Sequence, residues 1–161
     1  MSGLILEDLV VRRAENHVDW YQKLPPSKPP KFRPSKEEFV HRSKFMPPQE
    51  CKNHFLLALI AERSVRKTDQ GWSWTFDPST YDHLDVGNNQ SEVLNQLSCP
   101  VSFIYGENTM EFDTGDSIKE MKELLPKSSS VVALREAQHH LMLDKPLEFV
   151  EELDKLIQEF V

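Results

Sequence analysis

The second half of the sequence alternates short apolar runs with amphipathic stretches. Apolar runs at residues 101–105 and 130–134 predict buried strands, and a similar run at residues 4–6 predicts a third. Helices are predicted at residues 91–97, 116–125 and 146–160. Strands that alternate with helices are typical of parallel βαβ units. The expected fold class is therefore α/β, with a short parallel sheet of about three strands and flanking helices.

Residues 9–90 have a different pattern. The segment 24–34 holds five prolines, which predict an extended connection because proline fixes φ and lacks an N–H. Ser35 and Glu38 have the spacing of a capping box, so we expect helices at about 35–45 and 48–67. The alternation in "GWSWTF" is typical of either a short strand or an aromatic plug, and the pattern does not choose between them.

Composition limits the kinds of partner. The chain has 161 residues, of which 28% are charged, and its net charge is -7, which argues against binding to nucleic acid or to an anionic membrane surface. No apolar run is long enough to span a bilayer, and the first residues do not form a signal peptide. Cys51 and Cys99 lack metal-binding spacing and are interpreted as reduced thiols. We therefore expect a cytoplasmic protein.

Polar residues with catalytic chemistry follow each predicted strand. Glu7 and Asp8 come after the first strand, residues 106–113 after the second, and residues 136–140 after the third. In open parallel sheets, ligands bind beyond the carboxyl ends of the strands. A general base needs an imidazole that a carboxylate holds in one tautomer, and both groups are present in these loops.

Three stretches resemble parts of an α/β-hydrolase. "CPVSFIYGENT" and "REAQHHLMLDKPLEFVEELDKLI" are similar to the acid loop, the histidine loop and the last helix of that family, and "SGLILEDL" is similar to the strand that follows the nucleophile-bearing helix. The resemblance implies that residues 1–8 and 91–161 form the C-terminal half of the hydrolase core. It also implies that residues 9–90 are a helical cap or lid insertion.

The same resemblance assigns roles to individual residues. His139 matches the catalytic histidine of the family, and Asp8 is the expected carboxylate that orients it, with the Thr109 hydroxyl as an auxiliary hydrogen-bonding group. Glu111 is the alternative acid. A packing role for His139 and a capping role for Asp8 are the structural alternatives. His140 is interpreted as a packing residue.

The cap would shape the pocket for the acyl group. Trp72, Trp74 and Phe76 are the expected substrate-binding residues, although the same aromatic stripe is equally consistent with the core of the cap. No cofactor is expected. A metal site made of His139, His140 and Asp144 would have a spacing that fits no common signature, so none is predicted.

One catalytic element is missing from the sequence. A nucleophile elbow reads Gly-x-Ser-x-Gly, and no two of the five glycines bracket a serine at that spacing. The family places this elbow and the oxyanion-hole loop upstream. We therefore expect a chain that lacks the nucleophile-bearing half, is inactive alone, and leaves the strand at residues 4–6 as an exposed apolar edge.

Two functions remain open on the sequence alone. The first is an esterase-like serine hydrolase acting on a small ester or acyl substrate once the missing half is supplied. The second is a non-catalytic homologue of such a hydrolase that binds a second copy or a partner chain through the exposed strand edge.

Overall fold

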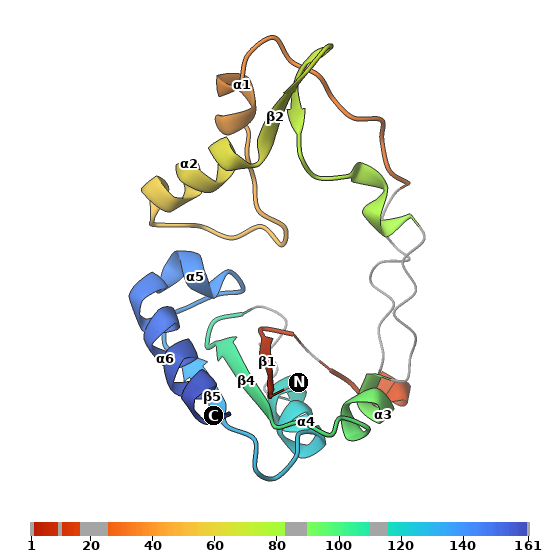
Figure 1. The fold of residues 1–161 in the computed structure, drawn as a ribbon, viewed down its shortest axis with the longest axis vertical. Helices are drawn as coiled ribbons and strands as arrows, with labels where there is room; N and C mark the ends of the chain where they lie inside the picture. The colour runs from red at the N-terminus through yellow and green to blue at the C-terminus, as the bar shows by residue number, and fades with distance from the viewer. Residues whose placement is uncertain (1, 10, 17–25, 83–89, 110–115, 161) are drawn as a thin grey trace. The chain divides into compact units, whose positions relative to one another are not determined.

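The computed structural model describes residues 2–9, 11–16, 26–82, 90–109 and 116–160. The chain divides into two compact units (Figure 1). The first consists of Met1–His17 together with Gly87–Val161, and the second of Val18–Val86. Each unit has its own arrangement and is described separately.

The first unit contains a three-stranded parallel sheet. Its strands are β1 (Leu4–Glu7), β4 (Val101–Gly106) and β5 (Val131–Leu134), in the order β1-β4-β5 (Figure 1). Its helices are α3 (Gln90–Asn95), α4 (Asp116–Leu124), α5 (Leu141–Asp144) and α6 (Pro146–Gln158), with a 3-10 turn at Ala14–Asn16. The expected α/β class with a short parallel sheet is confirmed. Helix α5 was not predicted, because four residues are too few to establish a helical period.

Apolar side chains cover both faces of this sheet. Phe103 of β4 packs with Met121 of α4 on one face, and both are fully buried. Ile104, the next residue along, packs with Leu156 of α6 on the other face. Successive strand residues point to opposite faces, so a strand covered on both sides must be apolar throughout. This is why the continuous run in β4 could be predicted from the sequence.

β1 forms one edge of the sheet. It pairs with β4 in the register Leu4↔Val101 to Glu7↔Ile104. The N–H groups of Leu4 and Asp8 donate to the carbonyls of Pro100 and Ile104 respectively. Because alternate residues of a strand bond to opposite sides, the peptide groups of Ile5 and Glu7 face away from β4. Within the described residues, no strand pairs with that side of β1.

The second unit is not purely helical. Its elements are α1 (Glu37–Val40), α2 (His54–Arg63), β2 (Val65–Thr68), β3 (Gly71–Trp74) and a 3-10 helix at Pro78–Tyr81. β2 and β3 form an antiparallel hairpin. The strand interpretation of "GWSW" is confirmed, so this unit contains a hairpin as well as helices. The predicted helix at 48–67 was too long because its last residues leave the helix to pair with β3.

The predicted capping box also does not form. α1 is only four residues long, and Lys36 precedes it without a side-chain hydrogen bond to the helix. Phe39 is the buried residue of this short helix, and its ring meets that of Trp74 edge to face at 5.0 Å. The Arg33 guanidinium lies 5.6 Å from the centre of the Phe39 ring. Packing against the hairpin, rather than a cap, therefore holds α1 in place.

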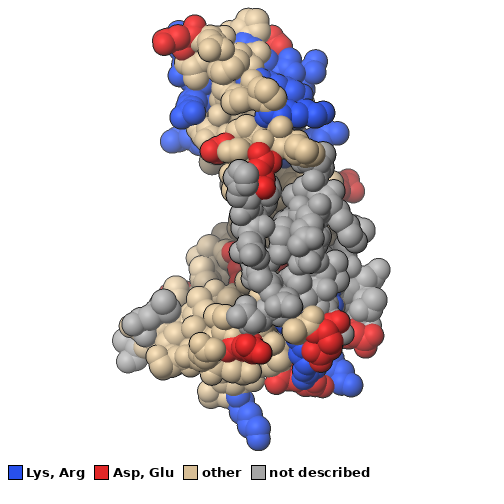
Figure 2. All heavy atoms as spheres, turned by 90° about the vertical axis from the view of Figure 1, so that its right-hand side faces the viewer, with Lys and Arg blue, Asp and Glu red and all other residues tan. Residues whose placement is uncertain are grey.

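Charge is distributed unevenly between the two units. Residues 18–86 hold 11 of the 19 basic residues but only 9 of the 26 acidic ones. Figure 2 shows Lys and Arg gathered over the second unit. The negative charge of the chain therefore belongs to the first unit. None of the helices in the described part of the chain is long and apolar enough to cross a membrane.

Candidate active site

Three side chains meet at the carboxyl ends of the three parallel strands. Asp8 follows β1, Thr109 follows β4 after a short turn, and His139 lies in the loop after β5. Hydrogen bonds link all three, although Asp8 and His139 are 131 residues apart in the sequence. The sheet brings them together because parallel strands place their carboxyl ends at the same edge.

The Asp8 carboxylate is the centre of this cluster. Only 2% of the residue is exposed. Its Oδ1 accepts the Gly106 N–H at 2.8 Å, and the Thr109 hydroxyl lies 3.0 Å from both carboxylate oxygens. Its Oδ2 lies 2.8 Å from Nδ1 of His139. Backbone, hydroxyl and imidazole groups therefore satisfy a carboxylate that water hardly reaches.

Asp8 also has an unusual backbone. Its φ is 46°, in the left-handed region that most residues avoid and that Asp and Asn tolerate best among residues with a Cβ. This turn ends β1 and directs the side chain back over the end of β4, where the Gly106 N–H lies. The residue type therefore suits both the conformation and the hydrogen bonds.

Gly106 joins the loops that follow β4 and β5. A Cβ at this position would lie 2.6 Å from the carbonyl oxygens of Ala137 and Gln138 and 2.8 Å from Oγ1 of Thr109. The Asn108 N–H also donates to the Ala137 carbonyl at 2.9 Å. This close approach, which only glycine permits, places the His139 loop against the Thr109 turn.

His139 has one ring nitrogen against Asp8, and the side chain is partly exposed to solvent. About a third of its side chain is exposed (32%), and its ring meets that of His140 edge to face at 5.0 Å. A carboxylate at Nδ1 favours the tautomer with the proton on Nδ1. Nε2 then carries the lone pair and can act as a base.

Comparisons with solved structures show the same fold. A thioesterase domain from the curacin biosynthetic pathway superposes with a TM-score of 0.65 at 16% identity, over 96% of this chain and 58% of that one. An esterase from Mycobacterium tuberculosis gives 0.65 at 15% identity, over 97% and 52%. A hypothetical protein from Pseudomonas aeruginosa PAO1 gives 0.61 at 18% identity, over 98% and 58%.

The fold is part of the α/β-hydrolase fold. The chain spans a little more than half the length of these three structures, and at such low identity the likeness concerns the fold alone. No protein-family model matches the sequence, and no curated protein matches it.

Burial dominates the electrostatics at this end of the α/β-hydrolase sheet. It raises the pKa of Asp8 above the ordinary value, although the bonds from Gly106, Thr109 and His139 act in the opposite direction. The pKa of Glu7 is also raised, first by burial and then by the Asp8 charge, while His139 lowers it. Two neighbouring carboxyl groups thus hold their protons to a higher pH than free ones.

These shifts predict how stability varies with pH. The folded state binds more protons than the unfolded state between the ordinary and the raised carboxyl pKa, so the free energy of unfolding falls as pH rises through that window. Asp8→Asn removes one of the two titrating carboxyl groups and the charge next to Glu7. The free energy of unfolding should therefore fall less steeply with rising pH in this variant. Urea denaturation at several pH values from about 4 upward measures both slopes. Equal slopes would contradict the raised pKa of Asp8.

The Thr109 hydroxyl makes a smaller contribution that can be measured. Thr109→Val keeps the shape of the side chain but removes a donor to the buried Asp8 carboxylate. We expect the free energy of unfolding to fall by about 1.5 kcal/mol, the lower end of the range for a hydrogen bond to a charged group. Thr109→Ser keeps the hydroxyl and is the control in the same urea titration. A valine variant as stable as the wild type would contradict the prediction.

Of the other predicted site residues, Glu111 lies outside the described residues. Trp72, Trp74 and Phe76 belong to the second unit, where Trp74 packs on Phe39 and 55% of Phe76 is exposed. The described side chains include no group of three or more His, Cys, Asp or Glu residues that could hold a metal ion.

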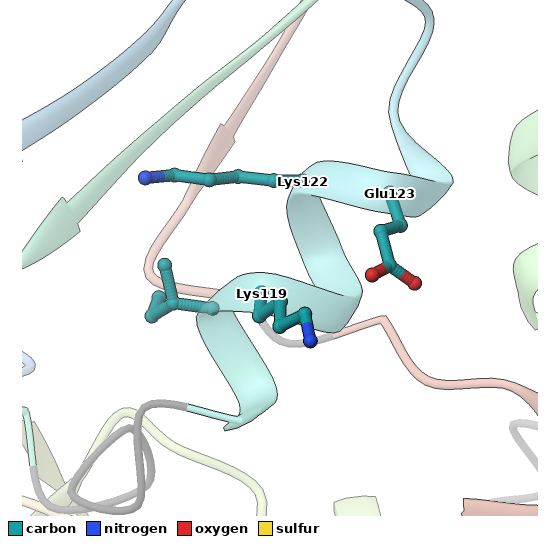
Figure 3. A pocket seen from close by; sticks show the side chains of 4 residues that line it. Lys119, Lys122 and Glu123 are labelled. Atoms are coloured by element: carbon teal, nitrogen blue, oxygen red, sulfur yellow. The ribbon is translucent and has the colours of Figure 1, made fainter.

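Two hollows are lined by residues outside this cluster. A hollow of about 400 Å³ lies on α4 and is lined by Ile118, Lys119, Lys122 and Glu123 (Figure 3). Another, of about 450 Å³, lies beside Cys51 in the second unit. Neither includes Asp8, Thr109 or His139, so the cluster is identified by its hydrogen bonds.

Sequence reasoning missed the backbone contribution of Gly106. Its N–H is a buried donor to Asp8, and its missing Cβ is what lets the two loops meet. The available signal was a glycine directly after an apolar strand, a position where a chain often needs close backbone approach.

Proposed function

We propose that this chain supplies the acid and the base of a serine hydrolase acting on an ester or a related acyl substrate. The observation that supports this most is the 2.8 Å hydrogen bond between Asp8 and Nδ1 of His139 at the carboxyl end of a parallel sheet. A buried carboxylate and a partly exposed imidazole in this order are what a catalytic triad requires behind its nucleophile.

Each residue has a definite role in this proposal. His139 takes the proton of the attacking hydroxyl through Nε2 and later gives it to the leaving group. Asp8 holds the ring in the right tautomer and stabilises the imidazolium that forms. Thr109 and the Gly106 N–H hold Asp8 in place. Trp72, Trp74 and Phe76 remain candidates for the acyl pocket.

Under this proposal, the nucleophile comes from polypeptide outside this sequence. The sequence contains no Gly-x-Ser-x-Gly, and the structures it resembles are longer than the chain. An acid–base pair without a nucleophile has almost nothing to activate, so the 161-residue chain alone should not hydrolyse esters above background.

The native protein provides the test. A fluorophosphonate probe is added to an extract of the source organism. Polypeptides that contain this sequence are then isolated, and their intact masses are measured by mass spectrometry. We expect a labelled serine on a chain heavier than 18.7 kDa, or on a polypeptide bound to this one. Replacing His139 by Gln in the native protein should abolish labelling. An unlabelled native species of 18.7 kDa without a labelled companion would contradict the proposal.

The second candidate function is binding without catalysis. Within the described residues no strand pairs with the outer side of β1, and this favours binding, because the peptide groups of Ile5 and Glu7 can pair with a strand from a second copy or another protein. In that case partner capture should survive Asp8→Asn and His139→Gln, whereas Ile5→Pro, which removes an edge N–H, should weaken it. Light scattering distinguishes a second copy from a different partner.

A further inference from the structure

One carboxylate ties the His139 loop to the short helix that follows it. Oδ2 of Asp144, at the end of α5, accepts the backbone N–H of Gln138 at 2.7 Å. Gln138 is the residue directly before His139. A hydrogen bond thereby closes the seven-residue segment from Gln138 to Asp144, which contains the proposed base.

We propose that Asp144 is a positioning residue for His139. It fixes the peptide that carries the imidazole and so determines whether Nδ1 reaches Asp8. This inference rests on the proposed function, because it concerns the same acid–base pair. Asp144 itself does not touch the reacting atoms.

Backbone hydrogen bonds hold the chain on both sides of His139. Before the histidine, the carbonyl of Ala137 accepts the Asn108 N–H at 2.9 Å. After it, the carbonyl of His140 accepts the Leu143 N–H at 2.9 Å in the first turn of α5. Between these two anchors, the Gln138 N–H to Asp144 bond restrains the peptide that leads into His139.

The helix itself does not depend on this bond. Leu141 and Leu143 of α5 are 0% and 1% exposed, and Leu141 belongs to the apolar cluster on that face of the sheet. These two side chains hold α5 whether or not residue 144 is a carboxylate. The loss of Asp144 should therefore loosen the His139 loop without releasing the helix.

A neighbouring ion pair offers a matched control. Lys145 donates to Oε2 of Glu136 at 2.9 Å, across the same loop, but 79% of the Glu136 side chain is exposed. Exposed pairs contribute little to stability. Lys145→Met removes a contact across the loop and leaves the bond from Gln138 to Asp144 unchanged.

NMR of the 161-residue chain with ¹⁵N-labelled histidine tests the inference. The readout is the exchange rate of the His139 Nδ1 proton with water, assigned by its loss in His139→Gln. The wild type and all variants are measured at one pH, about 7.5. In Asp144→Ala we expect exchange about ten times faster, which corresponds to the loss of one hydrogen bond. Lys145→Met should match the wild type.

Asp144→Asn separates positioning from folding. Its amide oxygen still accepts from Gln138, but as a neutral group it is a weaker acceptor. The Gln138 N–H and the His139 Nδ1 proton should therefore exchange faster together, by about three- to fivefold. If Asp144→Ala does not fold, Asp144→Asn tests whether Asp144 positions His139. Faster exchange at Gln138 alone, or an unchanged Nδ1 proton in a folded Asp144→Ala, would overturn the inference.

The failure of this inference is distinct from the failure of the proposed function. If Asp8→Asn leaves the His139 Nδ1 proton unchanged, Asp8 does not hold the imidazole, and the acid–base pair itself is wrong. If Asp8→Asn removes the proton from Nδ1 or accelerates its exchange while Asp144→Ala does neither, the pair stands and Asp144 has no part in positioning it.

Discussion

Gly106→Ala is expected to lower the free energy of unfolding by about 3 kcal/mol, at the upper end of the usual range for overpacking. The new methyl group would lie 2.6 Å from two backbone carbonyl oxygens, those of Ala137 and Gln138. Backbone atoms cannot rotate away as the end of a side chain can. The loop after β5 must therefore move, and His139 moves with it away from Asp8.

Urea denaturation and the His139 Nδ1 proton measure the two consequences of Gly106→Ala separately. Asn108→Ala is the control, because Asn108 is exposed and its bond to the Ala137 carbonyl comes from the backbone. The control should stay within about 0.5 kcal/mol of the wild type. A Gly106→Ala variant that matches it in stability and keeps the Nδ1 proton would show that the loops do not meet as closely as described.

Asp8→Ala should have an effect of similar or greater size, about 3–4 kcal/mol. The substitution leaves the buried Gly106 N–H and Thr109 hydroxyl without their acceptor, at about 1–3 kcal/mol each. It also places alanine at a φ of 46°, which costs about 1 kcal/mol more. His139 contributes less to this loss because its ring can turn to water.

Asp8→Asn is the informative comparison. Asparagine tolerates the left-handed conformation, and its amide oxygen can still accept from Gly106 and Thr109. Its NH₂ group, however, would face Nδ1 of His139 and favour the tautomer with the proton on Nε2. We expect a smaller loss of stability, about 1–2 kcal/mol, together with a reversed tautomer in the ¹⁵N spectrum. Equal destabilisation by alanine and asparagine would contradict this account.

The sheet could be predicted from the sequence because its central strand is covered on both faces. Such a strand must be apolar throughout, and the side chains of Phe103 and Ile104 pack in the apolar clusters on opposite faces of the sheet. The second unit was harder to predict. The sequence of β2 mixes polar and apolar residues as α2 does, so it does not show where the helix ends. In the structure, Val65 of β2 pairs with Trp74 of β3. Pairing with β3, which is a tertiary interaction, determines where α2 ends.

The candidate site was predictable in its side chains but not in its backbone. The resemblance to an α/β-hydrolase singled out Asp8, Thr109 and His139, and each follows a predicted strand of a parallel sheet, whose carboxyl ends lie at the same edge. The Gly106 N–H and the Asp144 carboxylate act through peptide groups, which are the same in every residue. The residue type does not indicate which backbone N–H groups will be hydrogen-bonded, so these two contributions are seen only in the structure.

The separation of β1 from β4 along the chain determines the order in which the site can form. Fewer than thirty residues intervene between β4 and β5, whereas more than ninety intervene between β1 and β4. Closing the longer loop costs about 1 kcal/mol more in chain entropy. We therefore expect a refolding chain to order the β4–β5 pair and α6 before β1 is added. The histidine would then be held in its loop while its carboxylate partner is still on an unfolded segment.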